Sequence, residues 1–170
     1  MDKRALHRIS YGVYIVCARL GERLNGQICN TVFQITSEPP VVAISINRGN
    51  FTHDCLCDLG AFSVSVLSTE APLRFIGRFG FRCGRDFEKL TGDVSYRMGR
   101  TGAPIVLDYC VAWLECSVVG RTDLGTHTLF MGEVVDCEIV DDKTPMTYEY
   151  YHNVVKGKSP ERAPTYIGQS

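Results

Sequence analysis

Polar residues interrupt or follow two neighbouring apolar stretches of the sequence, and their types suit ligand binding. Asn30-Thr31 lies inside the apolar run 27–36, and the polar segment 47–52 closes the apolar run 41–47. The second segment offers an arginine fork that matches phosphate, a glycine that allows close backbone approach, and the start of a helix whose free N–H groups attract anions. An asparagine amide can both donate to and accept from the polar edge of a ring. Together the two segments predict a surface that binds a phosphate and a ring system.

Both segments also have an ordinary structural explanation that the residues alone leave open. Asn30 shares a strand face with Val32, and a buried amide satisfied by its neighbours is common on such a face. The segment 47–52 equally suits a short helix capped by Asn50 or Thr52, beside a solvated arginine. Lys89 in "GRDFEKL" reads by itself as a surface lysine on a polar loop or helical turn.

Short strands and few helices are expected to position these residues. Asn25-Gly26 predicts a hairpin turn. Pro39-Pro40 ends the apolar run 27–36, because proline cannot extend a central strand. Helices are predicted from Asn50 or Thr52 to Gly60 and at 70–80. β-Branched, aromatic and alternating runs predict strands at 11–19, 27–36, 41–47 and 61–68, and a long pair at 106–125 and 127–140 around a turn at 121–126. This pattern favours a closed or split barrel.

Length and composition describe an ordinary globular domain. The chain has 170 residues, of which 45% are apolar and 22% charged, enough for one domain with a sizeable core. The net charge of −1 gives no basis for nucleic-acid binding, which normally needs a basic excess. No apolar run approaches the roughly 20 residues of a membrane span, and the polar start "MDKRALHRIS" lacks a secretion signal. We therefore expect a cytoplasmic protein with no membrane partner.

Eight cysteines are many for this length, and most occur in apolar runs such as "YCVAWLEC". No pair has the two-residue gap of a zinc or rubredoxin knuckle, and His7, His53 and His152 show no metal-ligand spacing. We expect reduced, mostly buried thiols and no metal. No Gly-x-Ser-x-Gly turn and no dinucleotide-type glycine loop occurs, so neither a serine nucleophile nor a Rossmann domain is predicted.

At this point the sequence resembles the flavin reductase-like FMN-binding split barrels, a family that includes flavoredoxins and the flavin-binding halves of high-molecular-weight rubredoxins. The resemblance runs from about Ser10 to Tyr166. It rests on the order and spacing of "NGQICNTVFQITSEPPVVAISINRGNFTHDCL", "GAFSVSVLS", "GRDFEKL", "GTHTLFMGEV" and "KGKSPERAPTY". The last of these is most similar to the flavin half of a rubredoxin fusion.

The resemblance implies a mainly β, Greek-key FMN-binding split barrel with a few short helices. It implies a flavin reductase-like FMN-binding domain at 1–155, a C-terminal tail at 156–170, and a homodimer with FMN near the subunit interface. It also implies NAD(P)H as the donor, with free flavin, a rubredoxin or a flavodiiron-type protein as the acceptor. The linker-like stretch within the tail is 156–164.

The resemblance also suggests roles for individual residues. Asn30 and Thr31 match the segment that contacts the flavin ring, and Thr52 matches a cofactor-contacting threonine. Many relatives place a serine where this chain has Phe51, so that hydroxyl contact is not carried over. Lys89 matches a lysine whose positive charge favours the reduced flavin ring. His127 matches a histidine beside the flavin that orients the nicotinamide or donates to the ring. Tyr166 matches a near-terminal aromatic residue that covers the flavin. The expected cofactor-binding residues are Asn30, Thr31, Val32, Ser45, Asn47, Arg48, Asn50, Thr52, Lys89, His127 and Tyr166, with His127 also the catalytic candidate.

Three other functions remain open on the sequence. The first is a flavoredoxin-type electron carrier that holds FMN tightly but reacts slowly with NAD(P)H, and the rubredoxin-fusion-like tail favours it. The second is a reductase that releases reduced flavin to a separate oxygenase. The third is a cofactor-free structural barrel. Separately, packing of the C-terminal segment on the barrel would also explain its aromatic residues Tyr150, Tyr151 and Tyr166.

Overall fold

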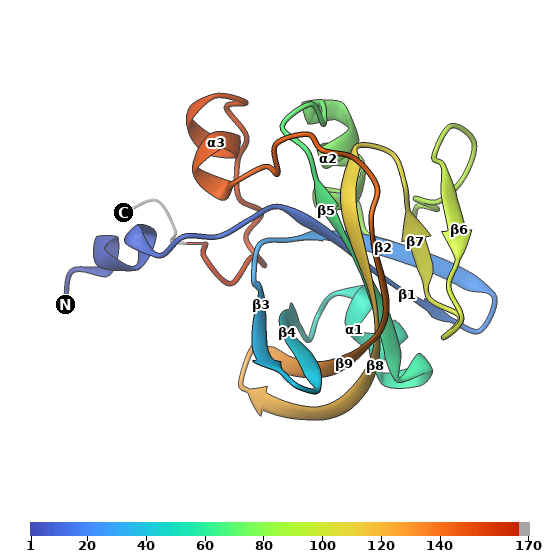
Figure 1. Cartoon of the computed structure of the whole chain (residues 1–170). Helices are drawn as coiled ribbons and strands as arrows, with labels where there is room; N and C mark the ends of the chain where they lie inside the picture. The colour runs from blue at the N-terminus through green and yellow to red at the C-terminus, as the bar shows by residue number, and fades with distance from the viewer. Residues whose placement is uncertain (167–170) are drawn as a thin grey trace.

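A curled seven-stranded antiparallel sheet forms the frame of the protein (Figure 1). The computed structural model describes residues 1–166. The strands lie in the order β2-β1-β5-β8-β9-β4-β3, and the split barrel expected from the sequence is confirmed. Their bounds are β1 (Tyr14–Leu20), β2 (Arg23–Cys29), β3 (Val32–Ser37), β4 (Pro40–Asn47), β5 (Ala61–Leu67), β8 (Cys110–Leu124) and β9 (His127–Ile139).

The remaining elements are short. Strands β6 (Tyr96–Met98) and β7 (Pro104–Val106) form a separate two-stranded ribbon. The helices are the 3-10 helix η1 (Lys3–Arg8) and the α-helices α1 (Phe51–Leu59), α2 (Leu73–Gly80) and α3 (Tyr148–Asn153). The predictions of α1, α2 and the long β8–β9 pair are confirmed, whereas η1, α3 and the β6–β7 ribbon were not predicted.

The first hairpin turns four residues earlier than the sequence predicts. Leu20 pairs with Arg23, so Gly21 and Glu22 form a two-residue turn, and Gly21 adopts a φ of 57°. Asn25-Gly26 is instead an interior pair of β2. The reason for the glycine is tertiary, because a Cβ at Gly26 would lie 2.8 Å from the sulfur of Cys17.

The predicted continuous strand 27–36 is two strands. β2 pairs with β1, whereas β3 pairs with β4, so the chain changes neighbours between them. Asn30 and Thr31 occupy this break. The carbonyl of Thr31 still accepts from the backbone N–H of Ser45 at 3.3 Å, but neither Asn30 nor Thr31 belongs to a strand. The expectation that they lie within one strand is therefore wrong.

The core lies on both faces of β1, because successive side chains of a strand point to opposite sides. Val16 and Ala18 point into the barrel, where α1 supplies Leu56. Ile15 and Cys17 point outward and are covered by α2 and by the segment that includes α3. This two-sided burial fixes α1 and α2 on either side of the β1–β2 hairpin, which sets the walls of the candidate site.

Five of the eight cysteines are buried, as the sequence predicts, and all eight are free thiols. Within residues 1–166, no helix combines the length and the apolar character needed to cross a membrane.

Candidate functional site

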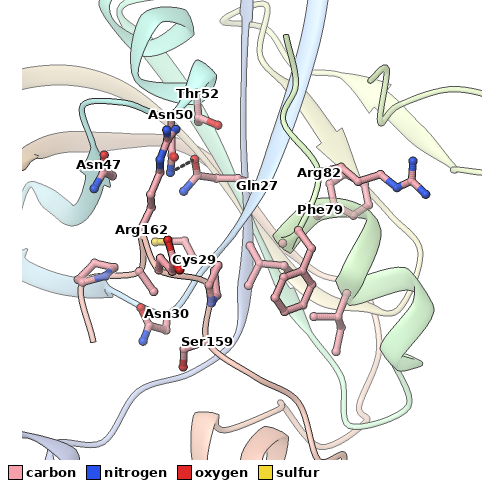
Figure 2. A pocket seen from close by; sticks show the side chains of 18 of the residues that line it. Gln27, Cys29, Asn30, Asn47, Asn50, Thr52, Phe79, Arg82, Ser159 and Arg162 are labelled. Carbon is pink, nitrogen blue, oxygen red and sulfur yellow. Dashed lines mark hydrogen bonds between the residues drawn. The ribbon is translucent and has the colours of Figure 1, made fainter. Parts of the chain in front are cut away.

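A cavity of about 580 Å³ lies between β2, the end of β4, the start of α1, helix α2 and the C-terminal tail (Figure 2). This volume is in the range of small-molecule binding sites. Its walls contain both predicted segments: Asn30 at the end of β2, and Asn47, Asn50 and Thr52 around the start of α1. The surface predicted from the two polar segments is therefore a single cavity wall.

At one side, Asn30 presents a buried and oriented amide. Only 4% of Asn30 is exposed. Its Nδ2 donates to Thr165 Oγ1 at 2.8 Å, and its Oδ1 accepts from Thr31 Oγ1 at 3.2 Å. These bonds use one donor and one acceptor site, so the amide retains capacity for a ligand.

At the opposite side, the start of α1 has no side-chain cap. Asn50 is the N-cap residue, but its amide does not bond to the helix N–H groups and instead donates to Gln27 Oε1 at 3.2 Å (Figure 2). Asn47 Oδ1 accepts from the backbone N–H of Gly49 at 2.9 Å, which shapes the loop before the helix. The first turn of a helix carries N–H groups that need an acceptor, and an anion meets this need well.

Thr52 and Asn25 form a buried pair in the same wall. Asn25 Nδ2 donates to Thr52 Oγ1 at 2.7 Å, which leaves the hydroxyl proton of Thr52 available for a ligand oxygen. The Oδ1 atom of Asn25 is buried and has no hydrogen-bond partner among residues 1–166. Because buried acceptors are nearly always satisfied, this atom indicates a ligand that supplies a donor, such as a hydroxyl group.

Lys89 is buried in the cavity wall, and its description as a surface lysine is wrong. It is 3% exposed, and its Nζ donates to the carbonyls of Gly26 at 2.8 Å and Phe79 at 3.0 Å. Burial lowers the pKa of Lys89 to about 8. The third N–H of its ammonium group remains for a ligand.

The C-terminal tail closes the cavity on a third side. Arg162 Nη1 donates to the carbonyl of Gly49 at 2.7 Å, beside the start of α1 (Figure 2). Tyr166, which is 39% exposed, also lines the cavity, as does the stretch 158–164. Much of the linker-like stretch therefore packs on the barrel rather than leading away from it.

Four of the expected site residues lie outside the cavity lining. Arg48 is exposed, and its backbone N–H donates to the carbonyl of Thr126. Val32 packs against the barrel core, and Thr31 reaches the site only through Asn30. His127 pairs with Asn47 across β4 and β9, and its Nε2 lies 3.3 Å from the carbonyl oxygen of Arg162, behind the tail.

The sequence did not single out several cavity residues. Arg162 was read as one charge in a linker-like stretch, and its only signal was the presence of an arginine in "SPERAP". Gln27, Phe79 and Arg82 also line the cavity (Figure 2), and no local pattern distinguishes them from ordinary strand and helix residues.

The lining is cationic although the whole chain carries a net charge of −1. Its charged residues are Arg82, Lys89, Lys158 and Arg162 against the single carboxylate of Glu161. Concentrating positive charge in one cavity attracts an anionic ligand. Among the described residues 1–166, no group of three or more His, Cys, Asp or Glu side chains is placed to hold a metal ion.

Comparison with known families places this chain in one of them. Residues 6–158 match the model of the flavin reductase like domain. The chain belongs to this family. The proposed domain boundary between residues 155 and 156 stays a prediction.

Two relatives match nearly the whole chain. The ferric-chelate reductase (NAD(P)H) of Archaeoglobus fulgidus is 50% identical over 98% of this chain and 98% of that protein. The high molecular weight rubredoxin of Moorella thermoacetica is 46% identical over 98% of this chain and 72% of that protein. Among solved structures, an FMN-binding protein from Thermus thermophilus with bound 1-cyclohex-2-enone gives a TM-score of 0.71 at 27% identity, over 78% of this chain and 72% of that chain.

Proposed function

We propose that this protein is an FMN-dependent oxidoreductase that takes electrons from NAD(P)H. One observation carries the proposal: an uncapped helix start, a free threonine proton and a cationic tail residue converge at one end of a cavity in a flavin reductase-like barrel. The names of relatives support the donor, since they include a ferric-chelate reductase (NAD(P)H) and an FMN reductase (NADH).

The residues divide into two groups around FMN. The start of α1, Thr52 and Arg162 suit the phosphate, because they offer backbone, hydroxyl and guanidinium donors together. Asn30 and Lys89 suit the ring, because they offer an amide with both polarities and a cation. Bound FMN supplies the electron-transfer chemistry that these side chains lack. The chain contributes position, charge and exclusion of water by the tail.

The experiment is anaerobic mixing of the FMN-loaded protein with NADH or NADPH in a stopped-flow spectrometer. We expect at least one of the two to bleach the visible flavin absorption rapidly, within the turnover times of ordinary enzymes. If dithionite bleaches the flavin but neither NADH nor NADPH does so rapidly, the reductase proposal is wrong. The flavoredoxin-type electron carrier would then be the remaining function.

The electron acceptor is proposed as a ranked set of candidates. The Archaeoglobus relative, matched over nearly its whole length, carries the name of a ferric-chelate reductase, and the cationic cavity suits an anionic chelate. A rubredoxin is the second candidate, because the Moorella relative is named a high molecular weight rubredoxin. Free flavin and a flavodiiron-type protein remain further candidates. Steady-state rates with ferric citrate, rubredoxin and free FMN rank them, and a ferric citrate rate below the other two would remove the first candidate.

His127 is proposed as a positioning residue for the donor. Its Nε2 lies near the carbonyl of Arg162, so its loss loosens the tail that borders the cavity. We expect His127→Ala to slow reduction by NAD(P)H about five- to a hundredfold, the effect of a lost contact of 1–3 kcal/mol, and to slow dithionite less. Equal slowing by both reductants would instead assign His127 to the flavin, and no slowing would remove it from the site.

A cytoplasmic homodimer remains part of the proposal. Exposed apolar side chains on β3, β8 and β9 support a second copy as a cover for this sheet surface; they include Phe33, Ile35, Val119, Leu124 and Val135. Light scattering on a size-exclusion column tests it, and a monomer mass at micromolar concentration would contradict it.

A further inference from the structure

Two elements, α1 and β8, bring together a thiol, an imidazole and a guanidinium outside the cavity lining. His53 and Cys57 are four residues apart in α1 and therefore lie on one helix face. The sulfur of Cys57 lies 3.8 Å from His53 Nδ1, and Arg121 Nη1 of β8 donates to it at 3.3 Å. Cys57 is exposed, so a reagent can approach this sulfur from solvent.

Two further residues determine which nitrogen of His53 faces the thiol as a base. The hydroxyl of Thr128 in β9 donates its proton to Asp123 Oδ1 at 2.6 Å, so its oxygen can only accept. His53 Nε2 lies 2.9 Å from this oxygen and therefore carries the ring proton. The lone pair is consequently on Nδ1, which faces the sulfur of Cys57.

Burial of the His53 ring favours its neutral form. Burial lowers the pKa of His53, although the neighbouring carboxylates of Asp54 and Asp123 oppose the effect, and Arg48 and Arg121 reinforce it. The hydrogen bond from Thr128 lowers the pKa of Asp123, so this carboxylate stays ionised as the anchor of the chain. A nucleophile, a base and an orienting group in hydrogen-bond contact form the general arrangement of an activated side chain.

We propose that Cys57 is a reactive thiol and a site of reversible mixed-disulfide formation with low-molecular-weight disulfides. The proton of the thiol passes to His53 Nδ1, and the thiolate lies against the Arg121 guanidinium. The thiolate attacks one sulfur of the small disulfide, whose S–S bond breaks as the new S–S bond to Cys57 forms. The departing thiolate takes the proton from His53. Cys57 is thereby oxidised, the small disulfide is reduced, and one small thiol is released.

Another exposed cysteine provides a matched control. Cys137 in β9 is exposed, but no imidazole lies within hydrogen-bonding distance of its sulfur among residues 1–166. Both thiols are exposed, and only the Cys57 sulfur, among residues 1–166, has the contacts with His53 and Arg121. This proposal does not depend on the cavity or on FMN.

The test measures the rate of thiol modification by dithiobis-nitrobenzoate, with peptide mass spectrometry to assign each modified cysteine. We expect Cys57 to react at least about tenfold faster than Cys137, and His53→Gln and Arg121→Gln each to remove most of this advantage. Cys137→Ser should leave the Cys57 rate unchanged. Oxidised glutathione should then add to Cys57 and be removed by dithiothreitol.

Equal rates at Cys57 and Cys137 in the unaltered protein would overturn the proposal. So would a Cys57 rate that neither His53→Gln nor Arg121→Gln changes. If His53→Gln folds poorly by circular dichroism, Arg121→Gln decides alone, because Arg121 is exposed and its replacement spares the core. An unchanged rate in that variant then counts against the proposal.

Discussion

Arg162→Gln is expected to weaken FMN binding about ten- to a hundredfold, whereas Arg48→Gln should leave it nearly unchanged. Arg162 donates to the Gly49 carbonyl at the start of α1 and lines the cavity, while Arg48 is exposed and does not line it. The guanidinium has further N–H groups free for phosphate oxygens. Glutamine retains a hydrogen-bond donor but lacks the positive charge and the paired N–H groups of a guanidinium. The loss of FMN affinity therefore measures the charge-assisted hydrogen bonds of Arg162.

The measurement is titration of the apoprotein with FMN, followed by quenching of flavin fluorescence. Riboflavin, which lacks the phosphate, serves as the matched ligand control. If Arg162 binds the phosphate, Arg162→Gln changes the affinity for FMN but hardly changes that for riboflavin. An unchanged FMN affinity in Arg162→Gln, or a larger loss in Arg48→Gln, would move the phosphate subsite away from the tail.

Between about pH 8 and pH 10, the free energy of unfolding of the apoprotein should rise relative to that of Lys89→Met. Burial lowers the pKa of Lys89 from 10.5 to about 8. In this window the unfolded lysine still holds its proton while the folded one has released it, so stability increases with pH. Below about pH 8 the buried lysine is charged, and this lowers the free energy of unfolding. The difference between the two pKa values corresponds to a cost of about 3 kcal/mol.

Urea denaturation at a series of pH values, under reducing conditions, gives the comparison. Burial raises the pKa of four thiols to about 12, so they lower stability above about pH 9 in both proteins; they are Cys17, Cys29, Cys55 and Cys116. Because the charge of Lys89 also lowers the pKa of Cys17, the two proteins are compared most directly between about pH 8 and pH 9. Lys89→Met leaves two carbonyls without a donor, which is a loss that does not vary with pH. Lys158→Met, at an exposed lysine, is the control and should follow the unaltered protein. Parallel pH curves for the unaltered protein and Lys89→Met would show that Lys89 is not held in a costly charged form.

The parts of the fold that the sequence predicted are those with local signals. Gly60 ends α1 with a φ of 66°, and the pair β8–β9 follows from two long apolar runs around a short turn. The hairpin at Asn25-Gly26 was wrong because Gly26 is required by packing against Cys17, a contact that no turn signal reveals. The break at Asn30 was missed because it follows from which strands pair with β2 and β3.

The candidate site likewise contains residues that a local sequence pattern predicts and residues that no local pattern reveals. Asn50 and Thr52 were found because the start of a helix is a local pattern and also an anion site. Arg162 was missed because its contact with Gly49 joins residues 113 positions apart. The burial of Lys89 was missed because its partners, the carbonyls of Gly26 and Phe79, come from two other elements. Whether each expected residue touches FMN stays a prediction.

The most direct test of the central claim is the identity and amount of flavin in the purified protein. The protein is denatured, the released cofactor is separated by liquid chromatography, and its amount is compared with the protein concentration. The account predicts FMN, at about one molecule per chain after reconstitution. FAD as the dominant species, or a colourless protein that takes up no FMN, would contradict it.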